Sequence, residues 1–114
     1  LASGAAAAAK LLNTRERPSA IACFNDEMAI GAMHAIRSTG LSVPADISVT
    51  GFDDLSFAAF IDPPLTTISQ PTETFGTEAV ALLLDILEGR ASGTRHLTLP
   101  YQLVVRASTA APRD

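Results

Sequence analysis

The chain has 114 residues, of which 47% are apolar, and its 8 Lys and Arg against 12 Asp and Glu give a formal net charge of −4. This length suits one domain at most, and so many apolar residues can supply a core, which argues against disorder. The acidic balance argues against a surface that binds nucleic acid by neutralising phosphates, because that mode needs clustered basic side chains.

The counts of single residue types narrow the chemistry further. Cys23 is the only cysteine, which excludes an internal disulfide and any site built from several cysteines, and which fits a reducing compartment. His34 and His96 lie far apart in the sequence without nearby acidic or cysteine ligands, so we expect neither a metal site nor a histidine base. No phosphate-binding glycine loop is present, and we therefore predict no cofactor and no enzymatic activity.

The sequence contains no candidate membrane span or secretory signal. Its longest nearly uncharged apolar stretch, residues 79–84, is far shorter than the roughly 20 residues that a membrane helix needs. The first residue is Leu, and no basic segment leads into an apolar run with a cleavage site. We therefore expect no membrane partner, and we expect the chain to be a fragment whose true amino terminus lies elsewhere.

The first half of the chain alternates between helical and extended patterns. An alanine-rich run at residues 5–12 has high helix propensity. The short apolar run at residues 20–24 is typical of a central parallel strand that is covered on both faces. A helix is predicted over residues 26–38 and a second strand over residues 47–52. This order is a strand–helix–strand unit, which indicates an α/β fold with a parallel sheet.

The helix predicted over residues 26–38 has two apolar faces. One face follows the i, i+3, i+4, i+7 spacing of a core-facing helix, with Gly40 as the stop, and consists of Ala29, Ala32, Met33 and Ile36. Ile30 and Met33 lie toward a neighbouring face, and residues 57–61, including Phe60 and Ile61, add further large apolar groups. These residues predict either a partner surface or an ordinary broad core face.

The second half contains one long helix between short extended segments. Residues 73–87 are predicted to form a helix that ends before Gly89. Because this helix is apolar nearly all round, we expect it to be buried on more than one side. Candidate strands occupy residues 65–68, 96–99 and 102–105. Pro71 and Pro100 bracket the segment between the first and last of these strands. Either the chain leaves one sheet for another at these prolines, or they simply end strands, which the residues alone favour.

Polar residues follow three of the predicted strands. Asn25, Asp53 and Gln70 each come directly after an extended run. In parallel α/β sheets ligands bind beyond the carboxyl ends of the strands, so these side chains are expected to converge on one crevice. An amide both donates and accepts hydrogen bonds and a carboxylate accepts two hydroxyls. The set therefore predicts a site for a neutral polyhydroxylated ligand such as a sugar or nucleoside, with no proton transfer.

Each of these residues also has a purely structural interpretation. Asn25 or Asp26 could cap the helix that follows, which is the commonest use of such residues at a helix start. Asp53 and Asp54 could be solvated turn residues, and because adjacent side chains alternate in direction, only one of them is expected to face a ligand.

Four sequence blocks in a fixed order carry a family resemblance. Residues 25–32, 43–54, 63–71 and 103–109 read NDEMAIGA, VPADISVTGFDD, PPLTTISQP and LVVRAST. In this order the blocks closely resemble the carboxyl-terminal part of transcriptional regulators of the lactose/galactose-repressor (LacI/GalR) family. The resemblance extends over nearly the whole chain.

This resemblance implies an α/β fold of the periplasmic-binding-protein-like type I class, three-layered with parallel sheets, present only as a carboxyl-terminal fragment. Residues 1–71 would belong to the carboxyl-terminal lobe of an effector-binding domain. Residues 72–99 would cross into the amino-terminal lobe, residues 100–109 would return, and residues 110–114 would form a tail.

The function implied by the resemblance is that of a cytoplasmic regulator. A sugar-like effector would control operator binding allosterically through a helix-turn-helix domain missing from this chain, and the protein would be a homodimer. Asn25, Asp53 and Gln70 match effector-contacting positions. The dimer face matches Ile30, Met33, Phe60 and Ile61. The alternative is a sugar-binding protein that feeds a transporter, because such proteins share the fold and the Asn-Asp motif.

Overall fold

A computed structural model describes residues 1–91 and 93–112, and the chain divides into two compact units. The first unit combines Leu1–Ser69 with Leu103–Asp114, and the second is Gln70–Gln102. The predicted excursion of residues 72–99 falls inside the second unit. Its assignment to another lobe remains a prediction.

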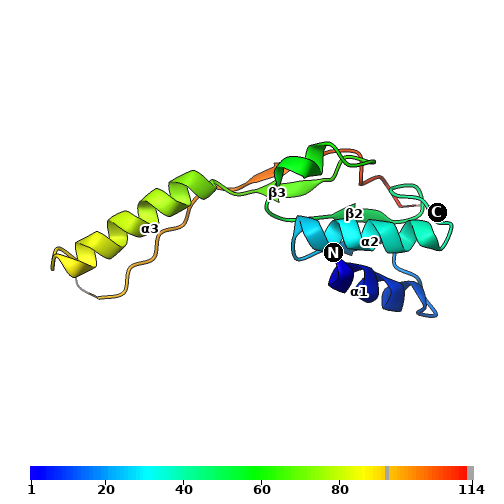
Figure 1. The fold of residues 1–114 in the computed structure, drawn as a ribbon, viewed down its shortest axis with the longest axis horizontal. Helices are drawn as coiled ribbons and strands as arrows, with labels where there is room; N and C mark the ends of the chain where they lie inside the picture. The colour runs from blue at the N-terminus through cyan, green and yellow to red at the C-terminus, as the bar shows by residue number, and fades with distance from the viewer. Residues whose placement is uncertain (92, 113–114) are drawn as a thin grey trace. The chain divides into compact units, whose positions relative to one another are not determined.

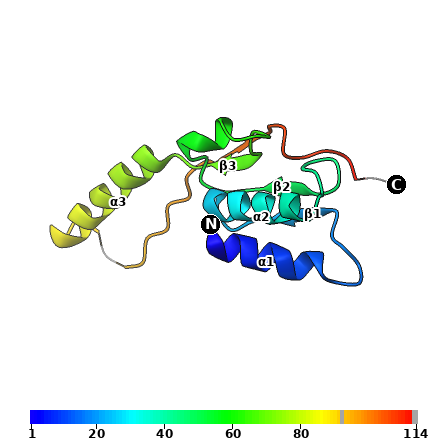
Figure 2. The same ribbon diagram turned by 45° about the vertical axis from the view of Figure 1, so that its right-hand side comes forward.

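The first unit is built around a parallel pair of strands connected by a helix. Helix α1 (Ala2–Leu12) precedes strand β1 (Ala20–Ala22), which leads through helix α2 (Asp26–Ser38) to strand β2 (Ser48–Thr50). The two strands are parallel, with Ile21 opposite Val49. Both views show α1 and α2 side by side next to this sheet (Figure 1, Figure 2). The predicted strand–helix–strand unit is therefore confirmed.

A short connection links β2 to the remaining strands. The 3-10 helix η1 (Ser56–Ala59) precedes strand β3 (Thr67–Ser69), and β3 pairs with β4 (Gln102–Val104) in a second two-stranded sheet. Isolated parallel bridges at Thr50–Thr66 and Asp53–Ser69 join the end of β2 to the β3 segment. Strands β1, β2 and β3 therefore run in the same direction, and their carboxyl ends lie at one edge.

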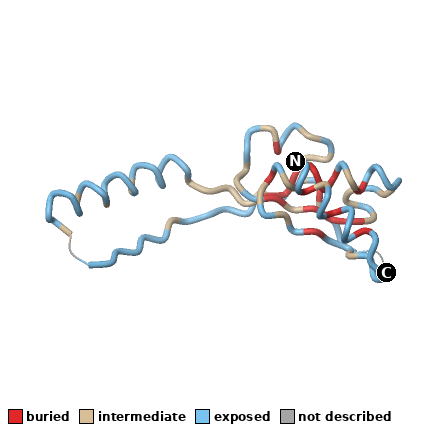
Figure 3. The backbone as a smooth tube through the Cα atoms, turned by 60° about the horizontal axis from the view of Figure 1, so that its bottom comes forward, coloured by how far each residue is buried: buried red, intermediate tan, exposed pale blue. Residues whose placement is uncertain are grey.

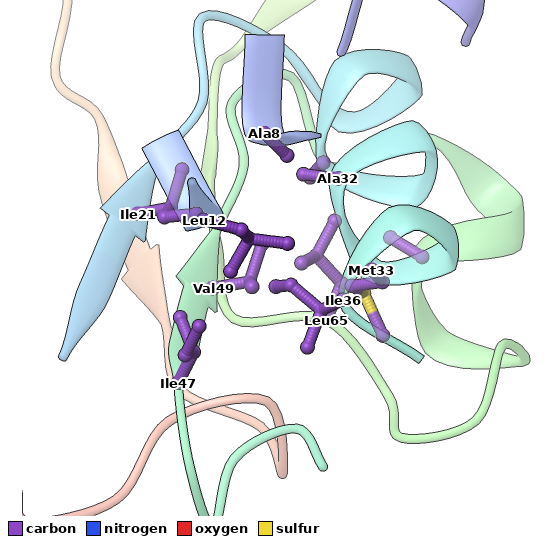
Figure 4. Packing of buried hydrophobic residues seen from close by; sticks show 11 residues of the cluster. Ala8, Leu12, Ile21, Ala32, Met33, Ile36, Ile47, Val49 and Leu65 are labelled. Atoms are coloured by element: carbon purple, nitrogen blue, oxygen red, sulfur yellow. The ribbon is translucent and has the colours of Figure 1, made fainter. Parts of the chain in front are cut away.

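Buried side chains from both helices and both strands form the core of this unit. Leu12 of α1, Ile36 of α2 and Val49 of β2 turn toward a common centre (Figure 4). The predicted buried face of α2 is confirmed, because its four members are at most 3% exposed. The expectation that β1 is covered on both faces is wrong within the described residues. Ile21 is buried, but Ala20 and Ala22 are exposed because α1 and α2 supply only one covering layer.

Two glycines allow α1 and α2 to approach closely. A methyl group added at Gly4 of α1 would collide with the backbone of Met28 in α2. The same change at Gly31 of α2 would collide with the backbone of Leu1 and crowd that of Ala5. A backbone cannot move aside as a flexible side chain can, so these positions require the smallest residue.

The second unit contains helix α3 (Thr72–Leu87) and a return segment. The helix matches the prediction to within one residue, and Gly89 follows its end with a φ of 70°. No residue of α3, all of which the structure describes, is buried (Figure 3). Phe75, Leu83 and Leu87 are 64%, 55% and 71% exposed, so this chain does not itself supply the expected burial.

The strand predicted over residues 96–99 is wrong, because that segment has no regular structure. A strand requires a hydrogen-bonded neighbour, and among the described residues none pairs with it. The later strand is confirmed as β4 because β3 is available beside it. None of the helices in the described part of the chain is both long and apolar enough to cross a membrane.

We expect Gly4→Ala to destabilise the first unit. The helix-propensity gain of about 1 kcal/mol is outweighed by overpacking, which typically costs about 1–3 kcal/mol. The matched control is Gly76→Ala in the interior of α3, where nothing lies near the added methyl, so only the propensity gain applies. Denaturant unfolding of both variants measures the difference. Equal stabilisation by the two substitutions would contradict the close helix contact.

Candidate functional site

The loop after β2 contains two consecutive aspartates in an unusual backbone conformation. Asp53 and Asp54 have φ values of 107° and 53°, a region that favours glycine. Such backbone strain persists only where the surroundings hold it, and it is concentrated at functional sites. This loop is the segment in which the sequence predicted a ligand-binding carboxylate.

Backbone hydrogen bonds hold the loop to its neighbours. The Gly51 amide donates to the Thr66 carbonyl at 3.0 Å, and the Asp53 amide donates to the Ile68 carbonyl at 2.9 Å. On the other side, the Asp26 amide donates to the Phe52 carbonyl at 2.9 Å. The last of these bonds joins the residue after Asn25 to the residue before Asp53. The backbones of two of the predicted site residues are therefore neighbours.

Asn25 caps helix α2. Its Oδ1 accepts a hydrogen bond from the Met28 amide at 2.9 Å, and its own backbone is extended, as an N-cap residue requires. The capping interpretation is thus confirmed for Asn25. The cap uses the oxygen of the side chain, and the amide nitrogen takes no part in that bond. Capping is therefore compatible with a contact to a ligand.

The carboxylate of Asp54 forms an ion pair within the first unit. Its Oδ1 lies 2.6 Å from Nη2 of Arg106, and both side chains are about one-fifth exposed. Arg106 also donates from Nη1 to the Leu65 carbonyl at 2.8 Å. This ion pair holds Asp54 within the scaffold, and the ligand-contacting role of the half-buried Asp53 remains a prediction.

Asp26 does not cap the helix but is its first residue, with no exposed surface. Its Oδ1 accepts from the Thr67 hydroxyl at 2.6 Å and its Oδ2 accepts from the Leu55 amide at 2.8 Å. Sequence reasoning missed this role. The available signal was Gly51, where the Asp26 carboxylate occupies the space that a side chain would fill.

Gln70 directly follows β3, is half-buried and is the first residue of the second unit. The structure thus brings Asn25 and Asp53 together at one edge of the first unit. The convergence of Gln70 with them remains a prediction.

This chain is similar in sequence to known proteins. Residues 2–109 match the family model described as a periplasmic binding protein-like domain. The chain is 42% identical to the HTH-type transcriptional repressor CytR of Escherichia coli (strain K12) over 108 residues, which are 95% of this chain and 32% of that protein. It therefore spans about a third of that relative. The chain belongs to the LacI/GalR family.

Two solved structures have the same fold as this LacI/GalR-family chain. A Lac repressor dimer bound to operator and the anti-inducer ONPF superposes with a TM-score of 0.87 at 43% identity, covering 96% of this chain and 38% of that one. A complex of the transcriptional regulator CelR with cellobiose gives a TM-score of 0.87 at 37% identity, covering 93% of this chain and 32% of that one. The named relatives are transcriptional regulators, not enzymes.

The residues that match the family's dimer face differ in their exposure. Phe60 is 87% exposed at the end of η1, and Ile30 and Ile61 are half-buried. Met33 is only 3% exposed and packs in the core of this unit, and its place on the dimer face stays a prediction. The reason for its burial is that Met33 shares the α2 face that packs inside the unit. Ile30, Phe60 and Ile61 remain predicted interface residues.

The single cysteine and the two histidines of the chain lie outside this loop. Cys23 is half-buried, and desolvation by burial raises the pKa of its thiol, so the thiolate is disfavoured. His34 and His96 are both exposed. No group of three or more His, Cys, Asp or Glu side chains within the described ranges is arranged to hold a metal ion.

We expect Asp54→Ala to lower the free energy of unfolding by about 1.5–3 kcal/mol, because it leaves the guanidinium of Arg106 without its carboxylate. The control is Asp85→Ala. Its ion pair with Arg90 is more exposed, because the side chains of Asp85 and Arg90 are 35% and 57% exposed to solvent. Exposed pairs of this kind contribute about 1 kcal/mol or less to stability. Denaturant unfolding of both variants provides the measurement. Equal losses would show that the Asp54 pair is not structural.

Proposed function

We propose that this chain is the effector-binding and dimerisation portion of a bacterial transcriptional regulator of the LacI/GalR family. Its effector is a small, neutral, polar molecule of the sugar or nucleoside class. A helix-turn-helix domain outside this chain binds operator DNA, and the regulator acts in the cytoplasm. The effector changes DNA binding allosterically.

The neighbouring placement of Asn25 and Asp53 carries this proposal. The Asp26 amide is bonded to the Phe52 carbonyl, which sets the ends of β1 and β2 side by side. The carboxylates of Asp26 and Asp54 are both bonded within the unit. An amide and a carboxylate at one strand edge can together bind vicinal hydroxyl groups, which both donate and accept hydrogen bonds. We propose Gln70 as a third contact.

The names of the similar proteins support the same class of function. CytR is called an HTH-type transcriptional repressor, one solved relative is a dimer bound to operator and an anti-inducer, and another is bound to cellobiose. The exposed apolar residues of α3 support the proposal that the second unit packs into another lobe. An effector that contacts two lobes shifts their equilibrium by its different affinity for the two arrangements.

We expect Asp53→Ala in the full-length protein to weaken effector binding by about 1.5–3 kcal/mol, because a charge-assisted hydrogen bond is lost. Calorimetry with D-glucose, D-ribose, cellobiose and adenosine measures the affinity. Glu16→Ala is the control, since it removes one exposed carboxylate from the segment before β1, at the opposite edge of the sheet.

Two results would contradict the proposal in different ways. Unchanged affinity of Asp53→Ala for every compound that binds the wild type would remove Asp53 from the site. A full-length protein that binds one of these compounds but no DNA would instead favour the sugar-binding component of a transporter.

We expect Phe60→Glu to raise the dimer dissociation constant about tenfold or more, because a large exposed aromatic ring is the best candidate for an interface anchor. Sedimentation of the full-length protein measures this constant. Leu11→Glu in α1 is the control, because Leu11 is an exposed apolar residue outside the predicted interface. Equal dissociation constants for the wild type and Phe60→Glu would exclude Phe60 from the dimer contact.

A further inference from the structure

Asp26 contacts the strained loop at both of its ends. Its backbone amide donates to the carbonyl of Phe52 at 2.9 Å, and its Oδ2 accepts from the amide of Leu55 at 2.8 Å. The two residues between these contacts are Asp53 and Asp54, both with positive φ. A single residue at the start of α2 is therefore hydrogen-bonded to both ends of the segment that contains the candidate ligand-binding carboxylate.

The position of the Asp26 carboxylate is itself fixed by its surroundings. It has no exposed surface, and its other oxygen accepts from the buried hydroxyl of Thr67 at 2.6 Å. A Cβ at residue 51 would collide with this same oxygen, so Gly51 leaves the room that the carboxylate needs. The start of α2 adds the favourable field of a helix amino terminus. Asp26 is thus held rigidly from three elements.

We propose that Asp26 is a positioning residue that determines effector affinity by holding Asp53 in its binding conformation. This inference rests on the proposed function. Asp26 is fully buried and reaches no ligand itself. It acts through the loop, because a strained backbone relaxes when one of its supports is removed. A ligand then has to restore the conformation, and that cost lowers its affinity.

Amide hydrogen exchange tests the holding role without any ligand. In the full-length protein, Asp26→Ala is expected to accelerate exchange of the amides of residues 53–55 about tenfold or more, as local opening becomes easier. The comparison variant is Thr67→Val, which removes the other hydrogen bond of the same carboxylate but leaves the bond to Leu55, so it is expected to accelerate exchange less. Unchanged exchange in Asp26→Ala, or equal acceleration in both variants, would overturn the proposal.

Affinity for D-glucose, D-ribose, cellobiose and adenosine tests the consequence. Asp26→Ala is expected to weaken binding about tenfold or more, and Thr67→Val, which keeps the bond to Leu55, is expected to weaken it less. In an Asp53→Ala background, Asp26→Ala should cause no further loss, because the group that it positions is gone. Fully additive losses would overturn the inference while leaving the role of Asp53 intact.

The isosteric variant Asp26→Asn is expected to restore both exchange protection and affinity. Its oxygen can accept from the Leu55 amide while its nitrogen donates to the Thr67 hydroxyl, which is also an acceptor. An Asn variant as weak as the Ala variant would contradict positioning by these hydrogen bonds.

If Asp26→Ala does not fold, Asp26→Ser replaces it. Serine leaves a smaller void than alanine but is too short to reach Leu55. If none of the four compounds binds the wild type, the proposed function fails, and the exchange data still decide the role of Asp26.

Discussion

A buried carboxylate, that of Asp26, connects the three elements that form the candidate site. It joins the start of α2 to the loop after β2 and to β3 through hydrogen bonds of 2.6 and 2.8 Å. Burying a charge is costly unless hydrogen bonds replace its hydration, and here both oxygens are paired. The arrangement therefore tolerates little movement, because displacing any one of the three elements would break at least one hydrogen bond of this buried carboxylate.

Three neighbouring aspartates have different surroundings in this arrangement. Asp26 is buried and bound to backbone and hydroxyl donors, whereas Asp54 forms an ion pair with Arg106. Asp53 lies between the two contacts that Asp26 makes with the loop, with a φ of 107°. The scaffold thus supports a backbone conformation that the Asp53 residue would not adopt by itself. In the proposed site, this preorganisation would lower the entropy cost of ordering the loop when a ligand binds.

Much of the fold could be predicted from local patterns, because helices and paired strands depend on short-range spacing. The helical repeat of Ala29, Ala32 and Ile36 identified the core face of α2, and all three residues are buried. The failures concern neighbours that a local pattern does not contain. Within the described part of the chain, residues 96–99 have an extended composition but no strand beside them, and one face of β1 has no covering layer. The helical spacing placed Met33 on both the core face and the neighbouring face of α2. Its burial became clear only from the packing of the folded unit.

By itself, the sequence determined the family, the order of strands and helices, and the polar residues at the strand ends, since each depends on residue types at short or fixed spacing. The tertiary structure alone decided that Asp26 and Asp54 are bonded within the scaffold. Asp26 and Asp54 have identical side chains, and their different roles follow from their partners Thr67 and Arg106, dozens of residues away in the chain. A side chain's chemistry is local, but its burial and its hydrogen-bond partners are set by contacts that form only when the chain folds.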